Sequence, residues 1–163
     1  MTIDKDAVKA EFIDMLRSTG REGVDYVIEE IERLGFFEAP ASANHHLNVE
    51  GGLTQHSLNV AKAALSVWEA LKPLEPTLEK EVTRDSIIIS ALLHDVCKAD
   101  IYRRTTKKRK NALGIWEDSE GYRLSYKGFP MGHGEKSLVV VLCSGIEPVS
   151  YTHLRAHETV LDL

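Results

Sequence analysis

The sequence predicts an all-α helical bundle with one short β-hairpin insertion near residues 113–127. Apolar residues recur at helical spacing through most of the chain of 163 residues. Glycine or proline follows most of these runs, and both residue types end helices. One stretch departs from this pattern, because alternating apolar and charged residues there surround the glycine-containing turn at 118–121, which is typical of a hairpin.

Two helices are expected in the first 35 residues. Residues 4–17 place Phe12 and Leu16 at helical spacing, together with Val8 and Met15. Residues 23–34 carry a second apolar stripe, and Gly35 follows it as a C-terminal cap. Each helix therefore has one face that must pack against other elements.

Three further helices are expected after a loop at residues 36–51. The first covers residues 52–71 and is closed by two prolines just beyond it. The next covers residues 84–99, and Thr83 offers a side-chain cap at its start. The last begins near Gly134.

Composition places the chain among ordinary globular proteins. Hydrophobic residues make up 43% and charged residues 28%. The net charge of −5 argues against a nucleic-acid-coating role, which normally needs a basic excess. No apolar run is long enough to cross a bilayer, the acidic N-terminus is not a signal peptide, and two cysteines make no disulfide framework. We therefore expect a cytoplasmic protein with no membrane partner.

The last residues have an unusual character. One reading frame of a common sequencing-library adapter encodes the residues found at 149–159. We therefore expect a single domain at residues 1–147, incomplete at its C-terminus, followed by a non-native tail at 148–163. The tail histidines, His153 and His157, are left out of the site for this reason.

A histidine and an aspartate, His94 and Asp95, directly follow the apolar run Ile87–Leu93. An imidazole and a carboxylate are costly to bury unless something binds them. A second imidazole, His56, lies on the helix predicted for residues 52–71, just after a glycine pair. This donor set suits one or two divalent ions of Fe, Mn, Co, Ni, Zn or Mg. The alternatives are a polar surface turn and a packed helical histidine.

Four other residues are candidates for the same site. His133 stands between two glycines at a helix start, which lets a ligand approach closely. His45 and His46 lie in the loop at 36–51. Lys98, one helical turn after His94, suits a phosphate oxygen as a point charge. Each also has an ordinary structural interpretation, as a helix-start histidine, a loop histidine or a solvated lysine.

A basic run covers residues 103–110. Such a cluster can steer an anionic substrate toward a cleft. A solvated surface loop explains it equally well.

Together these residues resemble the HD superfamily of metal-dependent phosphohydrolases, whose pattern is H…HD…D. His56 matches the first histidine, and His94 and Asp95 match the pair. Residues 45–57, 92–98 and 132–137 are similar to the HH…GGL…HS, LLHD(I/V)(G/C)K and GHGEKS stretches of one bacterial branch. The family's final aspartate, and a histidine that this branch tends to carry before it, have no counterpart between residues 137 and 147.

The resemblance implies an HD-domain helical bundle that hydrolyses a nucleotide or another small phosphoester. The implied roles are metal binding by His56, His94, Asp95 and His133, catalysis by Asp95, Lys98 and His133, and substrate binding by His45, His46 and Lys98. The partner expected is a small phosphorylated substrate, with no nucleic acid, and the oligomeric state stays open. The alternatives are a 3′-end exoribonuclease-like HD hydrolase and a catalytically silent metal- or nucleotide-binding regulatory domain.

Overall fold

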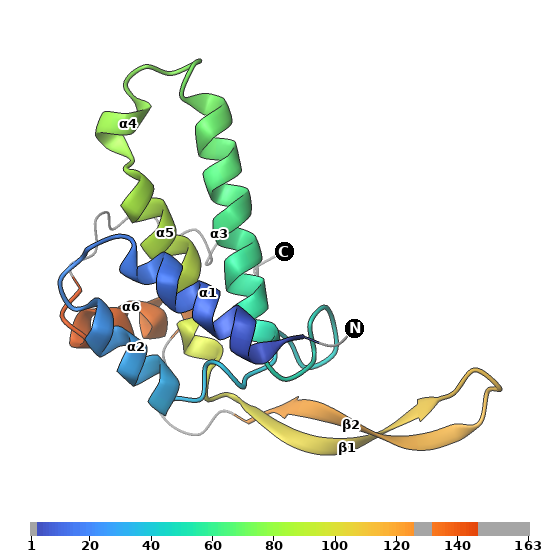
Figure 1. Ribbon diagram of the computed structural model, residues 1–163. Helices are drawn as coiled ribbons and strands as arrows, with labels where there is room; N and C mark the ends of the chain where they lie inside the picture. The colour runs from blue at the N-terminus through green and yellow to red at the C-terminus, as the bar shows by residue number, and fades with distance from the viewer. Residues whose placement is uncertain (1–2, 126–131, 147–163) are drawn as a thin grey trace.

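The computed structural model describes residues 3–125 and 132–146. This part is mainly helical and carries one β-hairpin (Figure 1). Its elements in order are α1 (Lys5–Arg17), α2 (Val24–Arg33), α3 (Gly52–Leu71), α4 (Leu78–Glu81), α5 (Arg84–Leu93), the 3-10 helix η1 (Val96–Lys98), β1 (Tyr102–Lys110), β2 (Trp116–Leu124) and α6 (His133–Cys143). The adapter-like tail expected at 148–163 lies outside the described residues.

The first two helices form as the sequence predicts. The side chain of Asp4 caps α1 by accepting the backbone N–H of Ala7 at 3.1 Å. From α1, the buried ring of Phe12 packs against Phe36, with ring centroids 5.2 Å apart. The predicted stripe of α2 is buried, and Gly35 has the left-handed backbone expected after a helix end, with φ of +83°.

Helices α3 and α5 lie side by side and run in opposite directions, with the short α4 at their far end (Figure 1). The indole N–H of Trp68 donates to the carbonyl of Val82 at 3.1 Å and ties the end of α3 to the chain entering α5. Thr83 caps α5 as predicted, accepting the N–H of Ser86 at 3.2 Å. These two helices position His56, which lies on α3, and His94 and Asp95, which follow α5.

The prediction of one helix over residues 84–99 is wrong at its C-terminal end. Helix α5 stops at Leu93, and Asp95 leaves the helical region with φ of −107° and ψ of 16°. A short 3-10 turn, η1, follows. Hydrogen bonds from α6 hold this turn. The local helix preference of residues 84–99 cannot predict them, because α6 lies about 40 residues further along the chain. The break therefore comes from tertiary contacts.

The hairpin exists, but its predicted boundaries of 113–127 and its turn at 118–121 are wrong. Strands β1 and β2 pair antiparallel from Tyr102↔Leu124 to Lys110↔Trp116. The turn lies between the strands, where the side chain of Asn111 accepts two backbone N–H groups and Gly114 has φ of +77°. The sequence of the basic run does not show the apolar–polar alternation of a strand, because the hairpin projects from the helices and has no buried face over most of its length (Figure 1).

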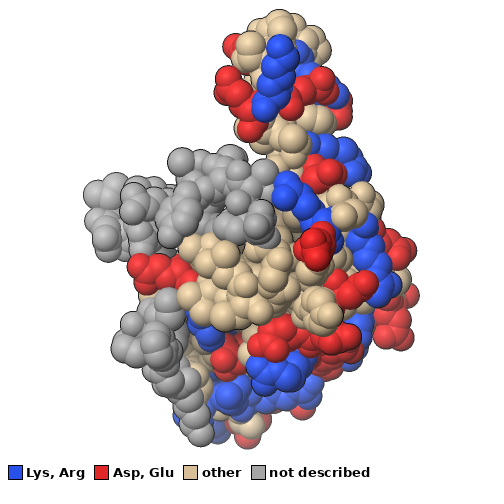
Figure 2. Space-filling model, turned by 90° about the vertical axis from the view of Figure 1, so that its left-hand side faces the viewer, with Lys and Arg blue, Asp and Glu red and all other residues tan. Residues whose placement is uncertain are grey.

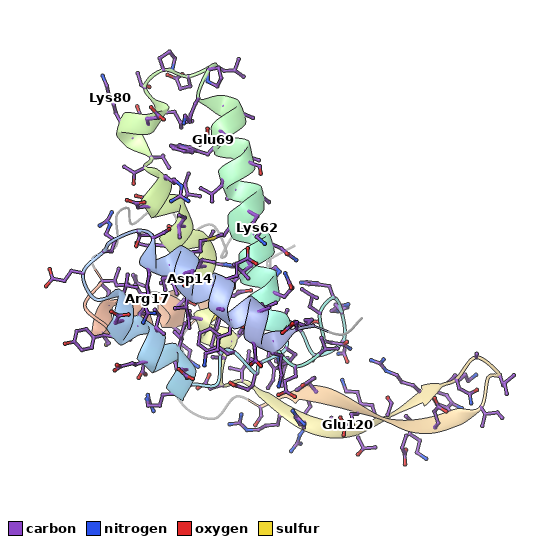
Figure 3. The ribbon with its side chains drawn as sticks, in the orientation of Figure 1. Asp14, Arg17, Lys62, Glu69, Lys80 and Glu120 are labelled. Atoms are coloured by element: carbon purple, nitrogen blue, oxygen red, sulfur yellow. The ribbon has the colours of Figure 1, made fainter. Side chains whose placement is uncertain are left out.

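Charged side chains cover the outside of the molecule. Some of them pair across the surface, as where Arg17 of α1 donates to Asp25 of α2 at 2.9 Å; Arg17 is labelled in Figure 3. On the face drawn in Figure 2, acidic and basic groups intermingle around an uncharged area. No helix in the described part of the chain is long and apolar enough to span a bilayer.

Candidate metal centre

Three separately predicted residues converge at one point. His56 comes from the second turn of α3, His94 caps the C-terminal end of α5, and Asp95 follows it at the start of η1. One donor atom from each of these side chains lies within 4.8 Å of the others. Two imidazole nitrogens and a carboxylate oxygen are a donor set that first-row transition metals favour.

The carboxylate of Asp95 is the centre of this group. Only 2% of the residue is exposed. Its Oδ2 lies 3.5 Å from Nε2 of His56, 3.3 Å from Nε2 of His94 and 2.8 Å from Nζ of Lys98. Burial alone raises the pKa of Asp95, but the two imidazoles and the ammonium outweigh it and hold the pKa below its ordinary value. Asp95 is therefore ionised, which is the form that a metal ligand requires.

The ring of His94 is oriented by its own helix. Its Nδ1 lies 2.8 Å from the carbonyl oxygen of Ala91, one turn earlier in α5. A carbonyl oxygen can only accept, so Nδ1 carries the proton and Nε2, which faces Asp95, is the basic nitrogen. A backbone acceptor of this kind is the usual orienting partner of a metal-bound histidine.

The start of α3 depends on two glycines. Gly51 has φ of +78°, a left-handed conformation that favours glycine. At Gly52 an added Cβ would lie 2.0 Å from the carbonyl oxygen of Leu47, so no side chain fits. The loop before α3 can therefore pack directly against the helix start, which fixes the first turn and with it the position of His56.

Residues 53–136, just over half of the chain, match the HD domain. This chain belongs to the HD domain family. A 67-residue stretch is 48% identical to the dihydroneopterin 2′,3′-cyclic phosphate phosphodiesterase of Methanocaldococcus jannaschii, covering 41% of this chain and 26% of that protein. The chain thus spans about a quarter of that relative. No solved structure matches.

The structure places the four remaining site candidates at different distances from the three donors. The ring of His46 lies 5.2 Å from that of His56, so the loop at 36–51 does reach the centre. His45 is exposed in the same loop and is not one of the three grouped donors. Lys98 contacts Asp95 rather than open solvent. His133 is the first residue of α6, and its side chain lies outside the described residues.

The hairpin supports the loop beside the HD centre. The ammonium of Lys107 donates to the carbonyl of Ala43 at 3.0 Å, and the hydroxyl of Tyr102 donates to that of Ala41 at 3.3 Å. Part of the basic run therefore has a structural task. The sequence offered no sign of it, because the contacts join residues about 60 positions apart.

Sequence reasoning also missed the contribution of α6. Buried Ser137 hydrogen-bonds to the backbone on both sides of Asp95, and Lys136 pairs with Asp100 just after η1. Both residues lie in the GHGEKS stretch, where the sequence singles out only His133 as a site residue. Their value is that they join α6 to the turn that carries two donors.

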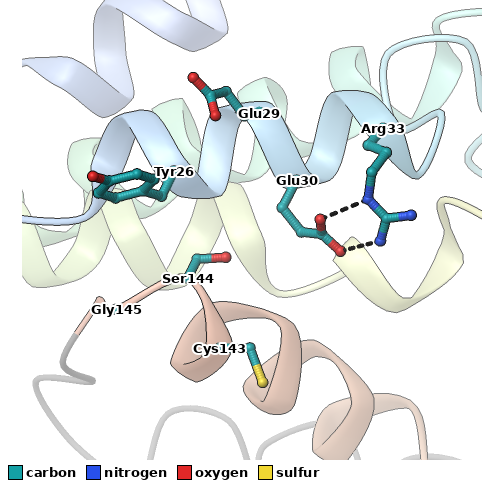
Figure 4. A pocket seen from close by; sticks show the side chains of 7 residues that line it. All are labelled: Tyr26, Glu29, Glu30, Arg33, Cys143, Ser144 and Gly145. Carbon is teal, nitrogen blue, oxygen red and sulfur yellow. Dashed lines mark hydrogen bonds and ion pairs between the residues drawn. The ribbon is translucent and has the colours of Figure 1, made fainter.

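A hollow of about 660 Å³ lies elsewhere, between α2 and the end of α6 (Figure 4). Its lining includes Tyr26, Cys143 and the ion pair of Glu30 with Arg33, whose closest atoms are 2.6 Å apart. None of the three grouped donors lines it. The hollow is therefore separate from the candidate metal centre of the HD domain.

Proposed function

We propose that this protein is a metal-dependent phosphohydrolase that acts on a small phosphoester. The observation that carries the proposal is the convergence of His56 and His94 on the buried carboxylate of Asp95. Lys98 gives this buried, ionised carboxylate one positive partner, and the two imidazole nitrogens beside it complete a donor set that suits a divalent cation. Membership of the HD domain family supports the same conclusion.

The residues present fit a divalent metal. His94 has its proton held at Nδ1 by a backbone carbonyl, so Nε2 is available to a cation, and Asp95 is deprotonated. His56 supplies the third donor. A divalent ion bound there polarises a phosphoryl oxygen and activates water as a nucleophile. We assign a further donor role to His133, at the start of α6, on the family resemblance.

Lys98 connects the ligands to the substrate. Its ammonium is half-buried and lies 2.8 Å from Oδ2 of Asp95. The ammonium of Lys98 would be placed to meet a non-bridging phosphate oxygen of a bound substrate, where a compact cation stabilises developing negative charge. His46, beside His56, and His45 in the same loop would contact the substrate from the other side.

The substrate class follows from the relative. Because the archaeal protein is named for a 2′,3′-cyclic phosphate, we infer a cyclic phosphodiester or a related nucleotide as the substrate of this chain. Arg103 and Arg109 share a strand face with Lys107, which touches the loop of His45 and His46. We assign to them the attraction of the anionic substrate.

The first test is metal content. Elemental analysis of the purified protein should find one or two equivalents of a transition metal, and His94→Ala should lose it. His45→Ala is the matched control, because it removes an exposed histidine outside the donor group. Metal retained in His94→Ala would show that the centre is assigned wrongly.

The second test is hydrolysis. The metal-loaded protein is assayed with adenosine 2′,3′-cyclic phosphate and with adenosine 5′-monophosphate. We expect ring opening of the cyclic phosphate and little release from the monoester. Metal binding with no hydrolysis of either would favour the silent regulatory domain.

A further inference from the structure

The hydroxyl of Ser137 bridges the turn that carries His94 and Asp95. Ser137 lies on α6 and is fully buried. Its Oγ donates to the carbonyl of His94 at 2.9 Å, and it accepts the backbone N–H of Cys97 at 3.1 Å. One side chain from a distant helix thus holds the backbone on both sides of Asp95.

The two groups that Ser137 binds lie at the break between α5 and η1. At such a break the last carbonyls of one helix find no N–H donor, and the first N–H groups of the next find no acceptor, within their own helices. His94 satisfies the carbonyl of Ala91 through its ring, and Ser137 satisfies that of His94. A hydroxyl suits this place because it donates and accepts at once.

Further residues hold α6 against the core and against the turn. Val141 and Ile146, on and just after α6, are buried in the core, and Lys136 pairs with Asp100 and donates to the carbonyl of Cys97 at 3.4 Å. Through its two hydrogen bonds, Ser137 therefore fixes the turn at Asp95 relative to α6. Its neighbours secure the helix, whereas Ser137 makes the bonds next to the two donors.

We infer that Ser137 is a positioning residue of the metal centre: its hydroxyl sets the backbone that aims His94 and Asp95 at a common ion. The inference rests on the proposed function. Removing a group that is hydrogen-bonded to a metal-ligating residue typically weakens metal affinity by about 10–100-fold. We expect a change of that size for Ser137→Ala.

The test uses cobalt, which reports affinity and geometry without any substrate. Metal-free protein is titrated with Co²⁺, and the visible absorption bands give both the dissociation constant and the ligand field. Ser137→Ala should raise the dissociation constant about 10–100-fold and alter the bands. Ser144→Ala is the matched control, because that hydroxyl donates to the carbonyl of Val140, one turn earlier and away from the site, and it should change neither.

A rescue variant separates positioning from general stability. Ser137→Thr keeps a hydroxyl, so it should recover most of the affinity and the wild-type spectrum. Circular dichroism of each metal-free variant checks folding, and if Ser137→Ala does not fold, Ser137→Thr alone decides. A folded Ser137→Ala with wild-type affinity and spectrum, or a folded Ser137→Thr with weak binding, overturns the inference. If wild-type protein fails to bind Co²⁺, the proposed function fails with it.

Discussion

Replacing Gly52 with alanine separates local helix preference from tertiary packing. Gly52 is the first residue of α3, and its backbone does not require glycine, since its φ is not positive. Local preference predicts that alanine stabilises this position by up to about 1 kcal/mol. In the structure, the alanine Cβ would lie 2.0 Å from the carbonyl oxygen of Leu47 and 3.1 Å from the backbone nitrogen of Ala41.

The size of the effect follows from these contacts. Cβ atoms do not approach other heavy atoms closer than 3.0 Å, so the carbonyl of Leu47 must withdraw by about 1 Å. That shift breaks its hydrogen bond with the N–H of Ala41, now 3.1 Å long. Overpacking costs about 1–3 kcal/mol, and an unmade buried hydrogen bond a similar amount. We expect a net loss of about 3 kcal/mol after the gain in helix preference.

Urea unfolding of metal-free protein measures this loss. Gly20→Ala is the control, because its backbone is left-handed with φ of +60° but nothing lies within 4 Å of the added Cβ. It should cost only about 1–2 kcal/mol. Sequence alone ranks the two substitutions in the opposite order. A Gly52→Ala protein as stable as wild type, or more stable than Gly20→Ala, would refute the close approach of loop and helix.

Three further outcomes are expected. Lys98→Ala should raise KM for a phosphoester about 10–150-fold, as loss of a charge-assisted hydrogen bond of about 1.5–3 kcal/mol requires, while elemental analysis finds unchanged metal. If metal is lost instead, Lys98 supports Asp95 rather than the substrate. Arg103→Gln with Arg109→Gln should lower kcat/KM at low salt and flatten its salt dependence. An unchanged salt profile would show that the two arginines do not attract the substrate and are only solvated surface residues. Trp68→Phe should lower the free energy of unfolding by about 1 kcal/mol in urea, and no loss would show that its bond to Val82 does not stabilise the α3–α5 end.

The elements that the sequence predicts well carry their own boundary signals. Helix α3 begins and ends where expected because Gly51 precedes it and a proline follows it, and Thr83 marks α5 in the same way. His94 and Asp95 can be recognised because they directly follow an apolar run, and His56 because it lies just after a glycine pair on a predicted helix. These signals act within a few residues, so they can be read from the chain alone.

The wrong prediction of the hairpin turn shows where local sequence signals fail. Gly121 resembles a turn residue, yet it lies within β2 opposite Thr105, under the side chain of Lys107. A Cβ there would meet that lysine at 2.9 Å, so the side chain of Lys107 would have to shift to make room for it. The real turn is built by the side chain of Asn111, whose role depends on its geometry. Cross-strand contacts of this kind leave no periodicity in the sequence.

The break after Leu93 explains why His94 and Asp95 can act together at all. Neighbouring residues in an α-helix point in directions about 100° apart, so they do not face a common point. Had α5 continued, as its residues favour, Asp95 would have turned away from His94. Because the chain leaves the helix at Asp95, its Oδ2 comes within 3.3 Å of His94 and 3.5 Å of His56. The site therefore depends on whatever ends the helix there, and the hydroxyl of Ser137 is the group that binds both sides of the break.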